Sequence, residues 1–369
     1  MTPTELPFPI KDDPLAWLRL TLVPGITPAR QQALLRAFGT PEEVLASPSS
    51  QVAAVADHDV ARRLAAGPDS ALLEATLRWL QAEGHHLLVM GDAAYPRLFC
   101  EIPDPPTVVY AIGHTEFLNV PSIAIVGSRN ATPQGVRDAA AFARALSDAG
   151  LCVVSGLALG IDASAHAGGL AGRSSTVAVM GTGADRIYPA RNRALAHDIA
   201  ARGCLLTEFP LGIGPVAGNF PRRNRLISGL ARGVLVVEAA DQSGSFITAR
   251  LAAEQGRDVF AIPGSIHSPL AKGCHILIKE GAILVDDARD VLVELGMAPV
   301  ERAAAKQPAP ETADPLLDAM GFAPVTVDQI ALLTGEEAPR ISAHLSRLEV
   351  DGRIEALAGG RYQRLDRPC

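Results

Sequence analysis

The sequence predicts an α/β protein: a Rossmann-like, doubly wound and mostly parallel sheet, preceded by an all-helical domain and followed by a winged-helix domain. Three observations carry this prediction. Seven short runs rich in Val, Ile and Leu alternate with helical segments between residues 121 and 296. Apolar residues recur at helical spacing from residue 14 to 84. From residue 314 to 369, three helical segments precede two β-like runs.

The first domain, which we assign to residues 1–84, is helical. Apolar residues repeat at helical spacing within residues 15–22 and again within 34–38. Between them, residues 23–28 read Val-Pro-Gly-Ile-Thr-Pro, a tight turn that opens a new helix. This pattern resembles a SAM-like or helix-hairpin-helix module, in which hairpin amides can contact a DNA phosphate. An ordinary turn in a small helical bundle fits as well, because the turn has no lysine and only Arg30 nearby.

The second domain, residues 85–296, is the predicted Rossmann-like domain. Four prolines between residues 95 and 113 prevent a regular helix, so we expect residues 95–120 to form an extended connector on the surface. The strands that follow lack polar alternation, as strands buried on both faces do. Separated by helices, they predict right-handed βαβ units. The candidate strands are Ile123–Val126, Leu151–Ser155, Thr176–Met180, Cys204–Thr207, Val234–Val237, Val259–Ile262 and Ile283–Val285.

The last two regions are a linker and a winged helix. Residues 297–313 are rich in Ala and Pro, which is typical of a linker. Residues 314–369 show the winged-helix pattern, and such domains often read duplex DNA. However, this region has nine acidic residues and six arginines, a net charge of −3. Duplex DNA binding, protein interaction and a role in stabilising the fold all remain open.

Composition limits the possible partners and the compartment. The net charge is −7, so any contact with DNA must come from a local basic patch. Aromatic residues make up only 4% of the chain, which makes an aromatic outside an apolar pattern informative. The five cysteines lack zinc spacing and read as reduced thiols, so we expect no metal and a cytoplasmic location. We expect neither a signal peptide nor a membrane span.

In open parallel sheets, ligands bind beyond the carboxyl ends of the strands. Gly127, Ser128 and Arg129 follow the first predicted parallel strand. Small residues let the backbone approach a phosphate, and an arginine adds a bidentate donor. The dinucleotide fingerprint G-x-G-x-x-G is absent, and no acid stands about 20 residues on to hold a ribose, so we expect no such cofactor. An ordinary tight turn with an exposed arginine fits this segment equally well.

Ser155 and Gly156 end the next strand and again suit a close anion. Asp162 and His166 follow four residues apart, so they share one face of a helix. Such a pair is compatible with a metal half-site or an acid–base pair. We favour a structural role, with Asp162 accepting from amides at the helix start and His166 bonded locally. Two ligands alone do not define a metal site.

The densest basic cluster lies within residues 209–237, a stretch with four arginines and no acid. An aromatic beside arginines is what single-stranded DNA requires, because bases stack and phosphates pair. A solvated basic face with the aromatic tucked inward is the alternative, and the density of the cluster favours binding. The cluster consists of Phe220, Arg222, Arg223, Asn224 and Arg225.

A further anion nest is formed by Ser243, Gly244 and Ser245 at a predicted helix start. Together with the loops after the earlier strands, it lines one edge of the predicted sheet. Several such nests in a row suit the repeated phosphates of a polymer better than one small ligand.

Taken together, these motifs resemble the DprA/Smf family of DNA-processing proteins, and the match covers about residues 80–295 in order and at the expected spacing. The residues that carry it are Tyr95, Pro96 and Leu98; Asp104 to Pro106; Ala124 to Arg129; Ser155 to Asp162 with Ala165 and His166; Phe220, Pro221 and Arg223 to Arg225; Ser243 to Ser245 with Thr248 and Ala249; and Pro263 with Gly264.

The resemblance implies single-stranded DNA binding without catalysis, delivery of that DNA to a RecA recombinase, and protection of incoming DNA during natural transformation. By position, Gly127 to Arg129 would hold phosphate, Phe220 would stack a base, and Ser243 to Ser245 would bind the backbone. Arg222, Arg223 and Arg225 would line the pocket. The sequence departs from the family at Ala217, where members often carry a lysine.

The resemblance also implies a homodimer through a surface near residues 273–284, where His275, Ile278 and Leu284 match. The rival class is a nucleotide-binding Rossmann enzyme of the phosphoribohydrolase type, which uses P-G-G-x-G-T-x-x-E. Here Pro263-Gly264 continues as Ser-Ile-His and lacks the catalytic acid, so we rank this class below DNA binding. A nucleotide sensor is a third option, because the same nests could hold a free nucleotide.

Overall fold

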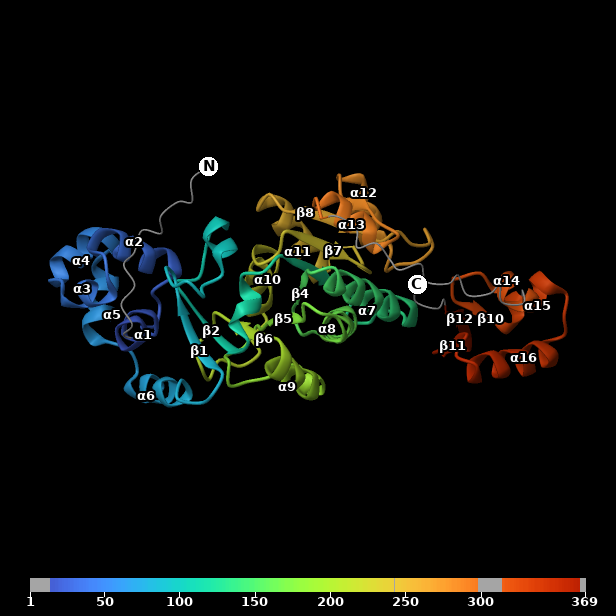
Figure 1. Ribbon diagram of the computed structural model, residues 1–369, viewed down its shortest axis with the longest axis horizontal. Coiled ribbons are helices and arrows are strands. Elements are labelled where there is room, and N and C mark those ends of the chain that lie inside the picture. Colours follow the sequence, from blue (N-terminus) through green and yellow to red (C-terminus); the bar gives the residue numbers. More distant parts are fainter. Residues whose placement is uncertain (1–13, 242, 298–313, 366–369) are drawn as a thin grey trace.

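The structure is a computed structural model that describes residues 14–241, 243–297 and 314–365 (Figure 1). The N-terminal segment, where we expect no signal peptide, and all but the first residue of the predicted linker lie outside the described residues. No helix within the described ranges combines the length and the apolarity that crossing a membrane requires.

The region before the sheet is helical, as predicted. Thr27 caps the second helix by accepting from the amide of Arg30 at 3.4 Å. Arg63 donates to the carbonyl oxygen of Pro24 at 3.2 Å, so a side chain already occupies an acceptor of the turn. The SAM-like assignment stays a prediction. The helices are α1 (Pro14–Thr21), α2 (Pro28–Phe38), α3 (Pro41–Ala46), α4 (Ser49–Ala56), α5 (His58–Ala66) and α6 (Ser70–Trp79).

The central sheet has nine strands in the order β1-β2-β6-β5-β4-β3-β7-β8-β9. All seven predicted strands are present, and they pair in parallel from β6 to β9. The strand order reverses at β3, between β4 and β7, which is the topological switch point. The strands are β1 (His85–Val89), β2 (Val108–Gly113), β3 (Ser122–Val126), β4 (Cys152–Ser155), β5 (Thr176–Val179), β6 (Cys204–Thr207), β7 (Gly233–Val236), β8 (Asp258–Ala261) and β9 (Ile283–Leu284).

The prediction that residues 95–120 form an extended connector on the surface was wrong in one respect. It contains β2, which pairs antiparallel with both β1 and β6 and therefore belongs to the sheet. Two short 3-10 helices flank this strand, η1 (Arg97–Glu101) and η2 (Thr115–Leu118). The prolines end at Pro106, so the backbone amides of β2 are free to pair with β6.

Helices cover both faces of the sheet, as the doubly wound prediction requires. One face packs against α7 (Pro133–Asp148), α8 (Ile161–Ala171) and α13 (Ala288–Glu294). The other packs against α10 (Asn219–Gly229), α11 (Gly244–Glu254) and α12 (Lys272–Lys279). The remaining helix, α9 (Arg193–Arg202), follows η3 (Ala190–Asn192) and packs beside β5 and β6.

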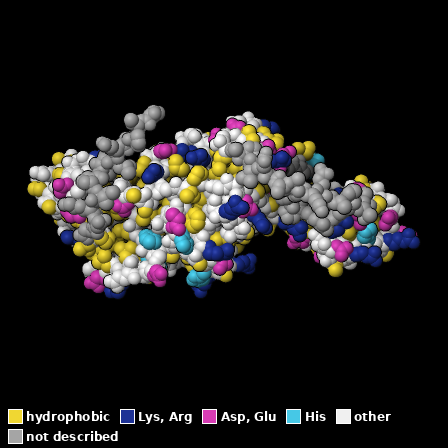
Figure 2. Space-filling model, in the orientation of Figure 1, with side chains coloured by type: hydrophobic (Ala, Val, Ile, Leu, Met, Phe, Trp, Pro, Cys, Tyr) yellow, Lys and Arg dark blue, Asp and Glu magenta, His cyan; other side chains and the backbone are white. Residues whose placement is uncertain are grey.

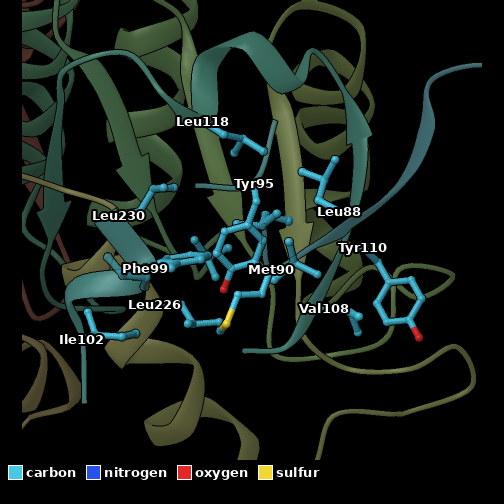
Figure 3. Close-up of a cluster of buried hydrophobic side chains, with 14 of the residues drawn as sticks. Leu88, Met90, Tyr95, Phe99, Ile102, Val108, Tyr110, Leu118, Leu226 and Leu230 are labelled. Carbon is cyan, nitrogen blue, oxygen red and sulfur yellow. The ribbon is translucent and has the colours of Figure 1, made fainter. Parts of the chain in front are cut away.

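A buried apolar cluster fixes α10 to the antiparallel end of the sheet (Figure 3). Leu226 of α10 and Leu230, which caps its C-terminus, belong to the same cluster as Phe99 and Ile102. At Gly229 the helix approaches this segment so closely that a Cβ atom would lie 2.8 Å from Ile102 Cγ2. Because α10 begins with the basic cluster, this packing determines where its arginines lie.

The C-terminal region folds as a winged helix, as predicted. Its sheet has the order β10-β12-β11, and its core contains Leu316, Ile330, Ile341 and Leu345. The elements are α14 (Pro315–Met320), β10 (Val325–Thr326), α15 (Val327–Thr334), α16 (Ala338–Val350), β11 (Ile354–Leu357) and β12 (Arg361–Arg364).

Candidate nucleic-acid interface

A cavity of about 590 Å³ opens at the switch point of the sheet. Its walls come from the loop after β3, the start of α8, the first turns of α10 and the start of α11. These segments include the loops that we predicted to bind anions and the predicted basic cluster. Nine of the thirteen predicted DNA-binding residues line it: Gly127, Ser128, Arg129, Phe220, Arg223, Asn224, Ser243, Gly244 and Ser245.

The loop after β3 forms one wall of the cavity. A Cβ atom at Gly127 would lie 2.6 Å from Ile161 Cγ1 and 2.9 Å from the carbonyl oxygen of Glu238, so only glycine fits between them. The Oγ of Ser128 accepts from the amide of Asn130 at 3.1 Å, which fixes the turn. Arg129 is exposed, and its Cζ lies 5.8 Å from the centre of the Phe220 ring.

Arg223 lies behind the aromatic ring of Phe220, with its Cζ 6.0 Å from the ring centre. Its exposed fraction is 4%. The guanidinium donates to the carbonyl oxygens of Gly156 and Val179, and its Nε donates to Oδ1 of Asn224 at 3.1 Å. Burial lowers the pKa of Arg223 to about 10. This arginine therefore carries positive charge at neutral pH and ties α10 to the ends of β4 and β5.

The start of α11 also lines the cavity. Ser243 caps the helix by accepting from the amide of Phe246 at 3.4 Å, and the hydroxyls of Ser243 and Ser245 lie 2.8 Å apart. A Cβ atom at Gly244 would meet no atom within 4 Å, so the first helical residue faces open space. The helix N-terminus and the two hydroxyls thus place hydrogen-bond donors in the cavity wall, an arrangement that favours an anion.

Ser155 and Gly156 do not line the cavity. Ser155 is fully buried, and its Oγ donates to the carbonyl oxygen of Ile125 at 2.6 Å. The carbonyl oxygen of Gly156 is one of the acceptors that hold Arg223. Both residues therefore support the site from beneath.

Arg222 and Arg225 also lie outside the residues that line the cavity, and both contact Glu208. Their Nη2 atoms lie 3.0 Å and 2.6 Å from Oε2 of Glu208, whose side chain is 2% exposed. Arg225 also donates to the carbonyl oxygen of Asp104, in the segment before β2. The side chain of Arg222 remains 46% exposed, so it is the member of this trio that solvent reaches.

Asp162 and His166 take the structural roles that we favoured. Oδ2 of Asp162 accepts from the amides of Gly156 at 3.1 Å and Ala158 at 3.3 Å. His166 lies 3.3 Å from the Leu157 amide through Nε2, and 2.7 Å from Oγ1 of Thr176 through Nδ1. Burial lowers the pKa of His166 to about 3, so the ring is neutral at physiological pH.

The sequence did not predict that Asp162 lines the cavity. Burial raises the pKa of this carboxyl group, while the nearby Arg223 opposes the rise. Asn130, Ala158 and Thr248 also line the cavity and were not predicted to bind DNA. Their proximity to predicted motif residues was the available signal. Ala217 lies in the wall as well.

The predicted dimer residues lie apart from the cavity, on α12 and β9. Nε2 of His275 lies 3.0 Å from the carbonyl oxygen of Gly264. Ile278 is half-buried against the core, whereas Leu284 is 50% exposed on the strand that ends the sheet.

One face of the molecule carries charges of both signs. Lys and Arg side chains are interspersed with Asp and Glu on the face shown in Figure 2. An anion site in this chain must therefore depend on local geometry, as the net charge of −7 suggested. Among the described residues, no group of three or more His, Cys, Asp or Glu side chains is arranged to hold a metal ion.

Comparison with known proteins identifies the family. Residues 86–296 match the family model of DNA recombination-mediator protein A, and residues 300–360 match that of the DprA winged helix domain. Protein Smf of Escherichia coli is 40% identical over 312 residues, which cover 80% of this chain and 82% of that protein. DNA processing protein DprA of Streptococcus pneumoniae is 46% identical over 203 residues, covering 55% of this chain and 72% of that one.

Two solved structures agree. That of Streptococcus pneumoniae DprA gives a TM-score of 0.68 at 36% identity, covering 77% of this chain and 99% of that chain. DNA processing protein A of Helicobacter pylori, whose single-stranded DNA binding mode has been described structurally, gives 0.53 at 30% identity and covers 57% and 95%. With the motifs assembled around one cavity, these matches show that the chain belongs to the DprA/Smf family of DNA recombination-mediator proteins.

Proposed function

We propose that the chain binds single-stranded DNA in the switch-point cavity and acts there without catalysis. The observation that carries this proposal is that Phe220, Arg129 and the N-terminus of α11 line one cavity, with Arg129 Cζ 5.8 Å from the centre of the Phe220 ring. An aromatic face takes a base of any identity, whereas the arginine and the helix amides take phosphates. This combination suits a polymer that is bound with little regard to its sequence.

The positions of the side chains suggest a separate role for each of them. Gly127, Ser128 and Arg129 contact one phosphate, and Ser243 to Ser245 contact another. Phe220 stacks a base between them, and Arg223 holds the ring and its surroundings in place. Asn224 lines the cavity and joins α10 to α11, because its Oδ1 accepts from Nε of Arg223 and its Nδ2 donates to the carbonyl oxygen of Gly244 at 3.2 Å. Arg222 reaches a phosphate just outside the cavity, while Arg225, Ser155 and Gly156 support the site through their internal hydrogen bonds.

The absence of catalysis is part of the proposal. Two acidic side chains stand nearest to the loop after β3, and both are engaged. Asp162 accepts from two amides, and Glu238 accepts from Oγ1 of Thr132 at 2.6 Å and from its amide at 2.9 Å. Carboxylates held in this way orient backbone rather than transfer protons. No cofactor is needed for the binding that we propose.

We further propose that the bound strand is delivered to a RecA recombinase, and that a homodimer carries it during recombination and natural transformation. Membership of a recombination-mediator family supports this role. The winged helix has a net charge of −3 in residues 314–369, which supports a protein partner at least as well as duplex DNA.

The deciding experiment compares three ligands by fluorescence anisotropy or competition: a single-stranded oligonucleotide, the same sequence as a duplex, and mononucleotides. We expect the single strand to bind most tightly, with similar affinity for different sequences. Tight binding of a mononucleotide with no gain for a longer strand would instead indicate a nucleotide sensor. For the delivery role, we expect catalytic amounts of the protein to accelerate RecA filament formation on single-stranded DNA.

A further inference from the structure

Tyr188 is an exposed aromatic residue at the outer side of the candidate site. It lies in the loop between β5 and η3, and its exposed fraction is 46%. Its ring centre lies 5.6 Å from that of Phe220, with the ring planes tilted by 45°. Tyr188 does not line the cavity, whereas Phe220 does. Phe220 therefore contacts both the cavity and a second ring outside it.

The backbone on both sides of Tyr188 is fixed. On one side, Oγ1 of Thr182 donates to the carbonyl oxygen of Arg186 at 2.6 Å, and the amide of Arg186 donates to Gly183 at 3.0 Å. On the other side, Nδ2 of Asn192 donates to the carbonyl oxygens of Leu157 at 2.9 Å and Ala158 at 3.1 Å. An exposed ring on a fixed backbone loses little entropy when a ligand covers it.

The ring of Phe220 is also fixed, and the same loop fixes it. A Cβ atom at Gly181 would lie 2.9 Å from Cδ1 of Phe220, so the ring rests on glycine backbone at the end of β5. The loop that carries Tyr188 thus supports Phe220 as well. Only 4% of the residues in this chain are aromatic, so the contact between the rings of Tyr188 and Phe220 is a distinctive feature.

The segment around Tyr188 is basic. Arg186, Arg191 and Arg193 lie within five residues of it and are all exposed. Asp185 is the acid closest in sequence, and its carboxylate lies 3.7 Å from Nε of Arg186. Phosphates that leave the cavity in this direction meet a surplus of positive charge, although the chain as a whole is negative.

We propose that Tyr188 is a second stacking residue, which takes the base next to the one on Phe220 as the strand leaves the cavity. This inference rests on the single-stranded DNA binding proposed above. Bases stacked along one strand are about 3.4 Å apart, and an extended strand spaces them further. Two tilted rings 5.6 Å apart therefore suit neighbouring bases of an extended, partly unstacked strand.

The test measures affinity for oligothymidylates that increase in length from two to twelve nucleotides. We expect Tyr188→Ala to bind the shortest strands as the wild type does, because they fill only the cavity. On longer strands it should bind at least about fivefold more weakly, since a stacked base is worth at least that factor. Tyr188→Phe and Tyr188→Trp are the matched controls, and they should retain the length-dependent gain. Phe220→Ala should lose affinity at every length.

A second measurement uses the unmodified protein and strands with 5-iodouracil at a single position. Photocrosslinking should attach adjacent positions of the strand to Phe220 and to Tyr188. If Tyr188→Ala matches the wild type at all lengths and only Phe220 is crosslinked, the inference is wrong while the proposed function stands. The same holds if Tyr188→Ala weakens all lengths equally, because that result indicates a structural role. If the wild type binds no single strand, the proposed function itself fails.

Discussion

Arg223 donates from its guanidinium to the backbone carbonyl oxygen of Gly156, a residue 67 positions earlier in the chain. The same nitrogen also donates to the carbonyl oxygen of Val179, so one side chain joins α10 to the ends of β4 and β5. Arg129, by contrast, lines the cavity, and no hydrogen bond joins its side chain to another of the described residues. Two arginines that face one aromatic ring therefore have different tasks, and mutation separates them.

Replacing Arg129 should weaken DNA binding and leave the fold intact. If Arg129→Ala removes one phosphate contact, the slope of log affinity against log salt should shrink by about 0.7, and affinity should fall for all sequences. Anisotropy titrations at several salt concentrations measure both. Arg144→Ala is the matched control, because Arg144 is an exposed arginine of α7 whose nearest acid is Asp148 at 3.9 Å. An unchanged slope in Arg129→Ala would place the phosphate elsewhere.

Replacing Arg223 should reduce stability as well as binding. Arg223→Ala leaves two buried carbonyl oxygens without their donor, which costs on the order of 2 kcal/mol of unfolding free energy. Arg223→Lys keeps the charge but loses the Nε bond to Asn224, so it should recover only part of the stability. Urea denaturation measures both variants. Full stability combined with lost DNA binding would make Arg223 a direct ligand.

Phe220 should contribute stacking energy. We expect Phe220→Ala to lose about 1–3 kcal/mol of binding free energy and Phe220→Trp to retain most of it. Oligonucleotide titration gives the affinities, and circular dichroism confirms that each variant is folded. A variant that unfolds easily yet binds normally at low temperature would show that the ring, which rests on Gly181, serves the core instead.

The sequence could predict those parts of the site that local patterns of residues determine, but not those that depend on tertiary contacts. Buried parallel strands and helix starts are local patterns, so the seven parallel strands and the cavity loops were predictable. The division of labour among the arginines was only partly visible. Arg223 lies four residues before Ile227 and seven before Leu230, both fully buried, so helical periodicity turns it inward. Counting the charged residues alone does not distinguish Arg223 from Arg222.

Other features needed the tertiary structure. Glu208 stands one residue before the acid-free stretch 209–237, and only the end of β6 shows that its carboxylate meets Arg222 and Arg225. The strand β2 was hidden by the prolines before it, because its partner β6 lies about 95 residues away and no local pattern records that pairing. The contact between Tyr188 and Phe220 is likewise a product of the fold.

His166 should make the protein less stable in mild acid. Its pKa is about 3 in the folded protein and near its ordinary value of 6.5 in the unfolded chain. Between these values the unfolded chain binds the extra proton, so stability falls as pH falls, by at most about 1.4 kcal/mol per pH unit. His166→Gln cannot take up this proton. Denaturation curves between pH 7 and 4 should show a larger loss for the wild type than for His166→Gln; equal losses would exclude His166 as the cause.

The last prediction concerns assembly, which we place at β9 and α12. The strand β9 ends the sheet, and Leu284 on it is 50% exposed, so two copies can cover this apolar edge by a twofold interface. We expect Leu284→Glu to give a folded monomer in light scattering. Ile278→Glu should do the same, but Ile278 also packs on the core, so its stability must be checked. A folded dimer in both variants would place the interface elsewhere.

A dimer at this edge presents two cavities, and that number has a measurable consequence. A long strand that occupies one cavity reaches the second at a high effective concentration, which raises avidity without any new contact. A short oligonucleotide fills only one cavity and gains nothing from the partner. The monomeric Leu284→Glu variant should therefore keep the wild-type affinity for a short strand and lose affinity disproportionately on long strands. If it is monomeric and binds long strands as the wild type does, each cavity acts alone, and the interface serves another purpose.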